Sequence, residues 1–220
     1  MIGFFISICK GACLGGIICI ISYIADNTVS HNSLKILLDK SSNLYKESKY
    51  AIGLNMLVLS PITYAIVDST IIDHTINPHT IDIGKIMCIL LIQSIGYYVV
   101  HASFHKTPRL YTYHKFHHKF DSVLVPSIGN AVSWQEYCMA YMLPFVCGAI
   151  ITKPNEISFI IPIGIVALLN MTIHCQELKS YEYNKYLVSP QQHIEHHIVR
   201  DKHFAAPLFN IDNLVTLLKK

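Results

Sequence analysis

The chain reads His101-Ala-Ser-Phe-His105, His114-Lys-Phe-His117-His118 and His193-Ile-Glu-His196-His197 in three short stretches, here called the histidine boxes. Residues that stand three or four apart lie on the same face of a helix. Each box therefore directs two or three imidazoles toward one point. Because neutral imidazole is the commonest metal-binding side chain, the three boxes together predict a metal site.

Long apolar runs surround the boxes. Hydrophobic residues make up 52% of the 220-residue chain and charged residues only 14%, whereas about a quarter of a soluble domain is charged. After a first run at residues 2–24, four runs approach the roughly 20 residues that cross a bilayer. These four runs cover residues 51–72, 83–100, 136–152 and 157–173. The sequence thus predicts a membrane protein, and its length suits one domain.

Loop lengths and basic residues predict the topology. The links at 73–82 and 153–156 are so short that each joins two antiparallel spans in a hairpin. Lys and Arg residues number four in 25–50, four in 101–135 and six from 175 onward, against one in the two links together. Under the positive-inside rule, the basic segments lie in the cytosol. We therefore expect an all-α integral membrane protein with about four transmembrane helices in two hairpins and a cytosolic helical cap that carries the histidine cluster.

The first apolar run leaves three alternatives open, because residues 1–24 can span the membrane, lie on it or be cleaved as a signal peptide. No clear cleavage site follows the run, which favours a retained anchor. The seven cysteines are odd in number and form no CxxC pair, so we expect small buried side chains rather than disulfides or a zinc site. A net charge of +3 is too small to indicate nucleic-acid binding.

Two further histidines, His174 and His203, stand near the eight of the boxes. An imidazole-rich donor set suits zinc, copper, iron or nickel and argues against magnesium or calcium. Two metal ions with four or five ligands each use most of these histidines, whereas a single zinc leaves half of them unused. Two redox-active metals at a bilayer surface indicate oxidation of an unactivated C–H bond of a lipid. The chain has no Glu-x-x-His pair on its predicted spans, so a di-iron site here is of the histidine type.

The run from His101 to His118 resembles the central signature of the sterol desaturase and fatty acid hydroxylase superfamily, in which H-x-x-x-H and H-K-x-H-H flank a link with Pro and Leu-Tyr. Pro126 and Ser133-Trp-Gln-Glu136 resemble the segment that follows. His174 resembles the lone histidine of the superfamily, and HIEHH at 193–197 resembles its last box. The resemblance divides the chain into an N-terminal hydrophobic anchor and polar connector, 1–50, and a fatty acid hydroxylase-like membrane di-iron domain, 51–215.

The resemblance implies an oxidoreductase of lipid metabolism, such as sterol biosynthesis, that hydroxylates or desaturates a sterol or fatty acyl chain. It implies two Fe ions, for which zinc can substitute, O2 as co-substrate, and a separate electron donor such as cytochrome b5 or a reductase. Tyr113 and Glu136 are the candidates that orient ligands. His203 is either a tenth ligand or an ordinary loop residue. The other implied metal ligands are His101, His105, His114, His117, His118, His174, His193, His196 and His197.

Three other functions remain as alternatives. A zinc-dependent membrane hydrolase needs a general base, but no HExxH motif supplies one, and Glu195 stands at an unsuitable spacing. A metal transporter needs facing ionisable groups at membrane depth, where only Asp68 and Lys85 occur. A non-catalytic relative has no use for intact boxes. The endoplasmic reticulum and a bacterial inner membrane both fit, with the active site on the cytosolic face, while the lipid, the reaction and the oligomeric state stay open.

Overall fold

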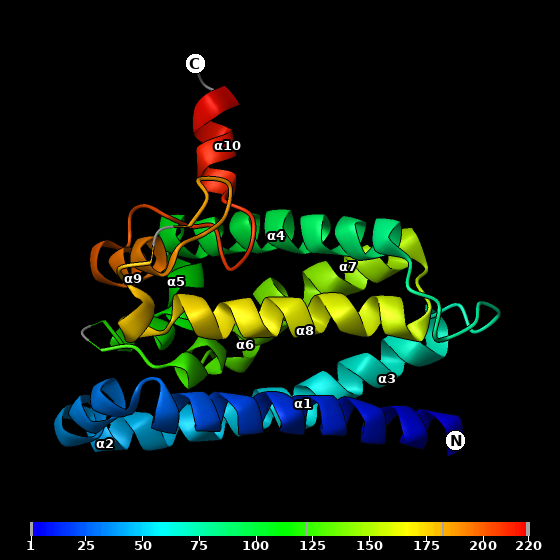
Figure 1. Ribbon diagram of the computed structural model, residues 1–220, viewed down its shortest axis with the longest axis horizontal. Helices are drawn as coiled ribbons and strands as arrows, with labels where there is room; N and C mark the ends of the chain where they lie inside the picture. Colours follow the sequence, from blue (N-terminus) through cyan, green and yellow to red (C-terminus); the bar gives the residue numbers. More distant parts are fainter. Residues whose placement is uncertain (1, 122, 182, 219–220) are drawn as a thin grey trace.

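The computed structural model describes residues 2–121, 123–181 and 183–218, and over these residues the chain is helical. Extended pairing in the described part of the chain is limited to one isolated bridge between Leu187 and Phe209. The long helices run side by side along the longest dimension of the molecule (Figure 1). The all-α fold class expected from the sequence is confirmed.

The N-terminal part forms a long antiparallel pair. Helix α1 (Ile2–Thr28) runs the length of the bundle, and α2 (His31–Leu54) continues through the π-helix η1 (Asn55–Leu59) into α3 (Ser60–Thr70), which returns alongside α1 (Figure 1). A kink at Ser41, where the backbone leaves helical geometry, bends α2. The polar segment expected at 25–50 is therefore mostly helical.

The rest of the bundle consists of α4 (Ile83–Lys106), α7 (Leu143–Thr152) and α8 (Glu156–Ile173), which pack together. In the described part of the chain, four helical segments are long and apolar enough to cross a membrane, namely α1, α2 through α3, α4 and α8. The expected number is confirmed, but the set differs in two places. The first apolar run is among the four spans, whereas the run at 136–152 is not.

The run at 136–152 is helical but irregular. It begins in the short helix α6 (Trp134–Glu136), widens into the π-helix η4 (Tyr137–Met142) and continues as α7. The side chain of Ser133 accepts the N–H of Glu136 at 3.1 Å and so fixes the start of α6. Polar residues in this first turn lower its hydropathy, although the segment lies within the bundle.

Short elements connect the long helices at one end of the bundle. Among them, α9 begins with a complete capping box, in which Ser189 and Gln192 exchange hydrogen bonds between side chain and backbone. Helix α10 projects away from the bundle (Figure 1). The short elements are α5 (Pro108–His114), η2 (His117–Lys119), η3 (Pro126–Asn130), η5 (Gln176–Leu178), α9 (Pro190–Val199) and α10 (Ile211–Leu218).

The two expected hairpins meet at the opposite end. The N–H of Asp73, after α3, donates to Pro154 O at 2.9 Å, between α7 and α8. The amide of Asn155 donates to Asn77 O at 2.8 Å and to Thr80 O at 2.7 Å. Both hairpin tips therefore lie on one side of the bundle, as their lengths predicted, while the histidine boxes lie at the other end.

Helix α1 packs closely against the second helix because its buried face is made of small residues. Gly11 and Gly15 stand four residues apart, as in close membrane helix pairs. A Cβ atom built on Gly11 would lie 2.7 Å from Pro61 Cα, and one built on Gly15 would lie 2.0 Å from Met56 O. At both positions the backbone of the neighbouring segment occupies the space of a side chain, so α1 is part of the bundle.

This contact predicts a difference between two adjacent glycines. In Gly15→Ala the new methyl group collides with Met56 O, so we expect a loss of roughly 1–3 kcal/mol, as is typical of overpacking. Gly16→Ala is the matched control, because a Cβ there meets nothing within 4 Å. Thermal unfolding of the two variants in detergent measures the difference. Equal stabilities would contradict the packing of α1 described above.

Candidate metal centre

The nine histidines expected as ligands all lie at one end of the bundle, on separate elements. The first box ends α4, the second occupies the end of α5 and η2, and the third lies on α9. His174 follows directly after α8 as its C-cap. Eight of the nine are buried, and only His105 is partly exposed. The fold thus gathers nine imidazoles at a single place and buries eight of them.

These nine side chains form two groups, which we call the five-histidine group and the four-histidine group. Within each group, one nitrogen of every ring lies within 4.8 Å of the corresponding nitrogens of the others. The five-histidine group consists of His101, His105, His114, His118 and His196, and the four-histidine group of His117, His174, His193 and His197. The five-histidine group takes residues from all three boxes, and the four-histidine group takes residues from the second and third boxes together with His174. Each group is therefore assembled by the fold and not by the local sequence.

The distances between neighbouring nitrogens match those around a metal ion. Two nitrogens bound 2.0–2.1 Å from one ion are about 2.9 Å apart at a right angle and about 3.4 Å apart at the tetrahedral angle. The Nε2–Nε2 distances are 3.0 Å for His101–His114, 3.1 Å for His101–His196, 3.1 Å for His105–His118, 3.3 Å for His117–His174 and 3.0 Å for His174–His193. The residues present therefore fit two bound ions.

The outward-facing Nδ1 atoms explain how the rings are oriented. Five of them lie against an oxygen atom, and four of these oxygens are backbone carbonyls, which only accept hydrogen bonds. The Nδ1 atom of these rings therefore carries the proton and Nε2 keeps a free lone pair. The pairs are His101 with Phe204 O (2.7 Å), His117 with Ala131 O (3.4 Å), His174 with Asn170 O (2.7 Å), His196 with Lys202 O (2.7 Å) and His114 with Glu136 Oε1 (2.7 Å).

This arrangement places lone pairs opposite one another. The Nε2 atoms of His101 and His196 are 3.1 Å apart, and the Nδ1–H of each ring donates to a backbone carbonyl on the other side of the ring. His174 and His117 face each other in the same way. Unprotonated nitrogens at this distance repel, and a cation between them turns the repulsion into coordination. The orientation of the rings is therefore that of ligands.

Burial keeps the imidazoles neutral. It lowers the pKa of His196 to about 3, and it holds the pKa values of His114, His117, His193 and His197 well below the ordinary value of a histidine. Neighbouring histidines lower them further. Because a metal binds only the neutral ring, the site is in its binding form across the physiological pH range.

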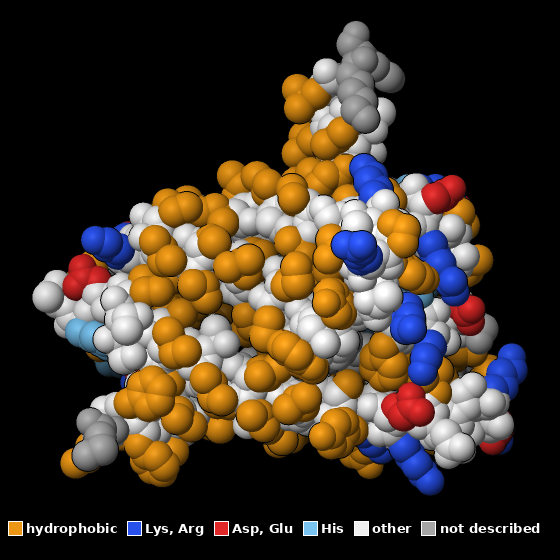
Figure 2. All heavy atoms as spheres, turned by 180° about the vertical axis from the view of Figure 1, so that it is seen from behind, with side chains coloured by type: hydrophobic (Ala, Val, Ile, Leu, Met, Phe, Trp, Pro, Cys, Tyr) orange, Lys and Arg blue, Asp and Glu red, His pale blue; other side chains and the backbone are white. Residues whose placement is uncertain are grey.

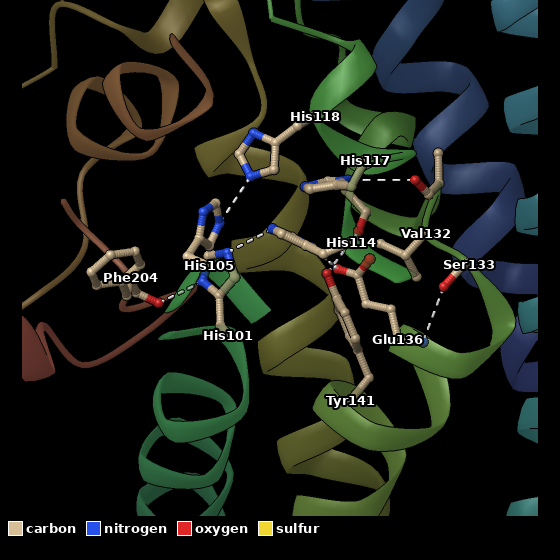
Figure 3. A network of polar contacts seen from close by, with 12 residues as sticks. His101, His105, His114, His117, His118, Val132, Ser133, Glu136, Tyr141 and Phe204 are labelled. Atoms are coloured by element: carbon tan, nitrogen blue, oxygen red, sulfur yellow. Dashed lines mark hydrogen bonds and ion pairs between the residues drawn. The ribbon is translucent and has the colours of Figure 1, made fainter. Parts of the chain in front are cut away.

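Glu136 supports His114 from below. Its Oε1 atom accepts the Nδ1 proton of His114 at 2.7 Å, and both side chains are almost fully buried (Figure 3). The cap by Ser133 fixes Glu136 at the start of α6. This direct contact with His114 is the one that the expected role of Glu136 in orienting a ligand requires. Tyr113, the other candidate, packs against the hydrophobic core, and its hydroxyl makes no hydrogen bond to the described residues.

His203, the expected tenth ligand, is not brought to either group. Its backbone has a positive φ of 59°, and its Nε2 lies 3.3 Å from Glu195 Oε2 on the outer side of α9. The loop after α9 instead contributes backbone carbonyls, at Lys202 and Phe204, to His196 and His101. In the structure His203 thus lies outside both groups, in the loop that follows α9.

The segment at 125–132 lies beneath the four-histidine group and is held by residues that sequence reasoning missed. Asp26, at the end of α1, is buried and accepts the N–H of Ser127 at 2.9 Å. The amide of Asn55 donates to Asn130 O at 3.3 Å and to Val132 O at 3.0 Å. Asp26 and Asn55 come from apolar or mixed stretches far from the boxes, and no motif marks them.

Clustered histidines at one end of membrane-crossing helices define a class of membrane protein with a multi-histidine metal site. Residues 86–216, more than half of the chain, match the family model described as Fatty acid hydroxylase. The chain therefore belongs to the fatty acid hydroxylase family, within the superfamily that its boxes resemble. Among curated proteins and among solved structures, nothing matches the chain.

The contact between Glu136 and His114 predicts a change in metal affinity. In Glu136→Ala the Nδ1 proton of His114 loses its acceptor, so the ring is free to turn and to change tautomer. Loss of such a supporting group typically weakens metal binding about 10–100-fold. Glu136→Gln keeps an acceptor oxygen and should retain most of the affinity. Titration with a competing chelator measures both variants, and wild-type affinity in Glu136→Ala would refute this role.

The lowered pKa values predict that the metal-free protein is destabilised by acid. Unfolded histidines titrate near 6.5, whereas His196 titrates at about 3 in the fold, so the unfolded state binds more protons below pH 6.5. Stability therefore falls as the pH drops from 6.5 toward 3, by about 1.4 kcal/mol per pH unit for this one residue. Thermal unfolding in chelator between pH 8 and 5 measures the slope. His196→Gln should flatten it, the exposed His31→Gln should not, and a slope of the opposite sign would contradict the argument.

Proposed function

We propose that the protein catalyses the O2-dependent hydroxylation or desaturation of a membrane lipid, a sterol or a fatty acyl chain, at a histidine-coordinated di-iron centre. Its family and its histidine cluster already mark it as a membrane protein of the lipid hydroxylase and desaturase kind. The single observation that carries the proposal is the division of nine clustered imidazoles, eight of them buried, into a group of five and a group of four.

The donor set supports iron. Imidazole nitrogens suit zinc, copper, iron and nickel, and oxidation with O2 requires a metal that changes redox state. The five-histidine group would hold one ion and the four-histidine group the other. When bound, the two ions supply the redox chemistry that activates O2 for attack on a C–H bond. Zinc, which binds the same ligands, is expected as a substitute when iron is scarce.

The protein's own groups hold and protect this chemistry. The carbonyls of Phe204 and Lys202 keep the Nδ1 protons of His101 and His196, so these rings present Nε2 to an ion. Glu136 does the same for His114. Burial of the rings excludes bulk water, which strengthens every electrostatic interaction inside the site. These residues thus fix the orientation and protonation of the histidine rings and keep water out of the site before a substrate binds.

The electron donor is expected to be a separate protein, such as cytochrome b5 or a reductase. Basic side chains gather at the histidine end of the molecule (Figure 2) and would attract an acidic carrier. They include Lys106, Arg109, Lys115, Lys119 and Lys202. The same charges support a cytosolic position for this end, in the endoplasmic reticulum or a bacterial inner membrane.

The hydrolase alternative finds no support in the position of its one candidate base. Glu195, in the third box, is partly exposed and accepts a hydrogen bond from Lys202 Nζ at 2.6 Å. Its other oxygen lies against His203 at 3.3 Å. The carboxylate is therefore engaged on the outer side of α9, away from both histidine groups.

Metal analysis of two histidine variants tests the proposal. Purified wild-type protein from iron-supplemented cells should contain two irons per chain. His197→Ala should lose iron and lipid oxidation, because His197 belongs to the four-histidine group. His203→Ala is the matched control and should keep both, since His203 lies outside the two groups. A single zinc per chain under iron-rich conditions, or lipid oxidation that survives His197→Ala, would overturn the di-iron proposal.

A further inference from the structure

A narrow apolar cavity runs inside the bundle below the histidine groups. It lies between α1, α3, α7 and α8 and is open to the outside at its mouth. Along α8 its lining extends from Phe159 to Asn170, which at 1.5 Å per residue is about 16 Å. Most of the walls are apolar, so the cavity fits a hydrocarbon chain.

At the histidine end of this cavity stands a polar side chain without a partner. Asn130 lines the cavity and is only 4% exposed, yet its Nδ2 has no hydrogen-bond partner among the described residues. A buried amide in this state carries a desolvation cost that a hydrogen bond would remove. Asn170, which also lines the cavity, differs because its Nδ2 donates to Gly129 O at 2.8 Å.

Asn130 also marks the point where the cavity meets the metal centre. The residue before it, Gly129, is so close to the ligand His174 that an added Cβ would lie 2.9 Å from Nδ1 of that ring. The residue after it, Ala131, offers its carbonyl to Nδ1 of His117. Both histidines belong to the four-histidine group. The backbone on both sides of Asn130 is therefore next to that group.

The other end of the cavity is apolar and aromatic. The rings of Tyr64 and Phe159 lie with their centroids 6.3 Å apart, and both line the cavity. The hydroxyl of Tyr64 is turned to Glu156, to which it donates at 2.8 Å, and Lys10 donates to the same oxygen at 2.6 Å. The phenol is thus held by a protein partner, unlike the Nδ2 atom of Asn130 at the histidine end.

We propose that Asn130 binds the oxygen-bearing end of the lipid substrate and that the cavity holds its hydrocarbon chain, directed toward Tyr64 and Phe159. This rests on the proposed function and adds a polarity to the bound lipid. The amide donates to a carbonyl, carboxyl or hydroxyl oxygen. The carbons next to that oxygen then lie closest to the four-histidine group, so oxidation takes place near the polar end of the chain and not near its methyl end.

Binding of three probes to the iron-loaded protein in the absence of O2 tests this inference without any catalysis. The probes are palmitic acid, hexadecanol and hexadecane, which share a chain length and differ in the oxygen group. Wild-type protein should bind the two oxygenated probes about two- to tenfold more tightly than hexadecane, the difference that one net hydrogen bond produces. Asn130→Leu should lose this preference and still bind hexadecane.

Stability separates binding from a structural role for Asn130. Because its Nδ2 has no partner, Asn130→Leu should unfold at nearly the wild-type temperature. Asn170→Leu removes the hydrogen bond to Gly129 O and should unfold at a lower temperature. If Asn130→Leu keeps the wild-type preference for oxygenated probes, or binds none of the three while folded, the proposal is wrong.

A second pair of variants ties the probes to this cavity. Ala167 lines it, so Ala167→Phe should weaken the binding of all three probes. Gly164, on the same helix, is outside the lining and has nothing within 4 Å of an added Cβ, so Gly164→Phe should bind normally. Wild-type binding by Ala167→Phe would place the probes elsewhere and overturn the proposal. Correct binding without lipid oxidation in the iron-loaded protein would instead refute the proposed function alone.

Discussion

The mutual repulsion of unprotonated imidazole nitrogens is the constraint on which the rest of this structure depends. Lone pairs near 3 Å apart are unfavourable without a cation, and the chain must hold them there. At five of the nine rings it does so by giving the Nδ1 proton a fixed acceptor on the far side of the ring. Most of these acceptors are backbone carbonyls of loops and helix ends, so the paths of those segments are dictated by the orientation of the rings.

The bundle supplies the rigidity that this orientation needs. The ends of α4, α8 and α9 have to arrive together, and the tips of the two hairpins are tied at the opposite end by hydrogen bonds from Asp73 and Asn155. Close packing of α1 through Gly11 and Gly15 adds a third contact along the length of the bundle. Helices fixed at both ends hold their terminal side chains to the small tolerance that metal ligation requires.

The sequence predicted the parts of the fold that depend on local pattern. The histidine boxes, the two hairpins and their common side follow from spacing and from short links, which are properties of neighbouring residues. Glu136 was found because it resembles a known position. The packing of α1 into the bundle was left open, because an apolar run has the same composition whether it is cleaved, exposed to lipid or paired with a helix.

Contacts made by the backbone escaped prediction for a different reason. Every residue has a backbone carbonyl, so the residue types at Phe204 and Lys202 do not indicate that their carbonyls accept hydrogen bonds from histidines. His203 was a candidate ligand because it is a histidine, whereas the groups of its loop that contact the metal-site histidines are the backbone carbonyls of its two neighbours. Asp26 and Asn55 are likewise ordinary in sequence, and only the tertiary fold brings them to the segment at 125–132.

The contact between Asp26 and Ser127 shows that the region recognised from the sequence is shorter than the region that the fold requires. The region that a sequence pattern recognises is 86–216, but the N–H of Ser127 and the carbonyls of Asn130 and Val132 take their partners from earlier residues. A shortened chain cut to the recognisable region would leave these groups without their hydrogen-bond partners directly beneath the four-histidine group. The smallest piece able to fold around the histidine cluster therefore begins well before the smallest piece that can be identified.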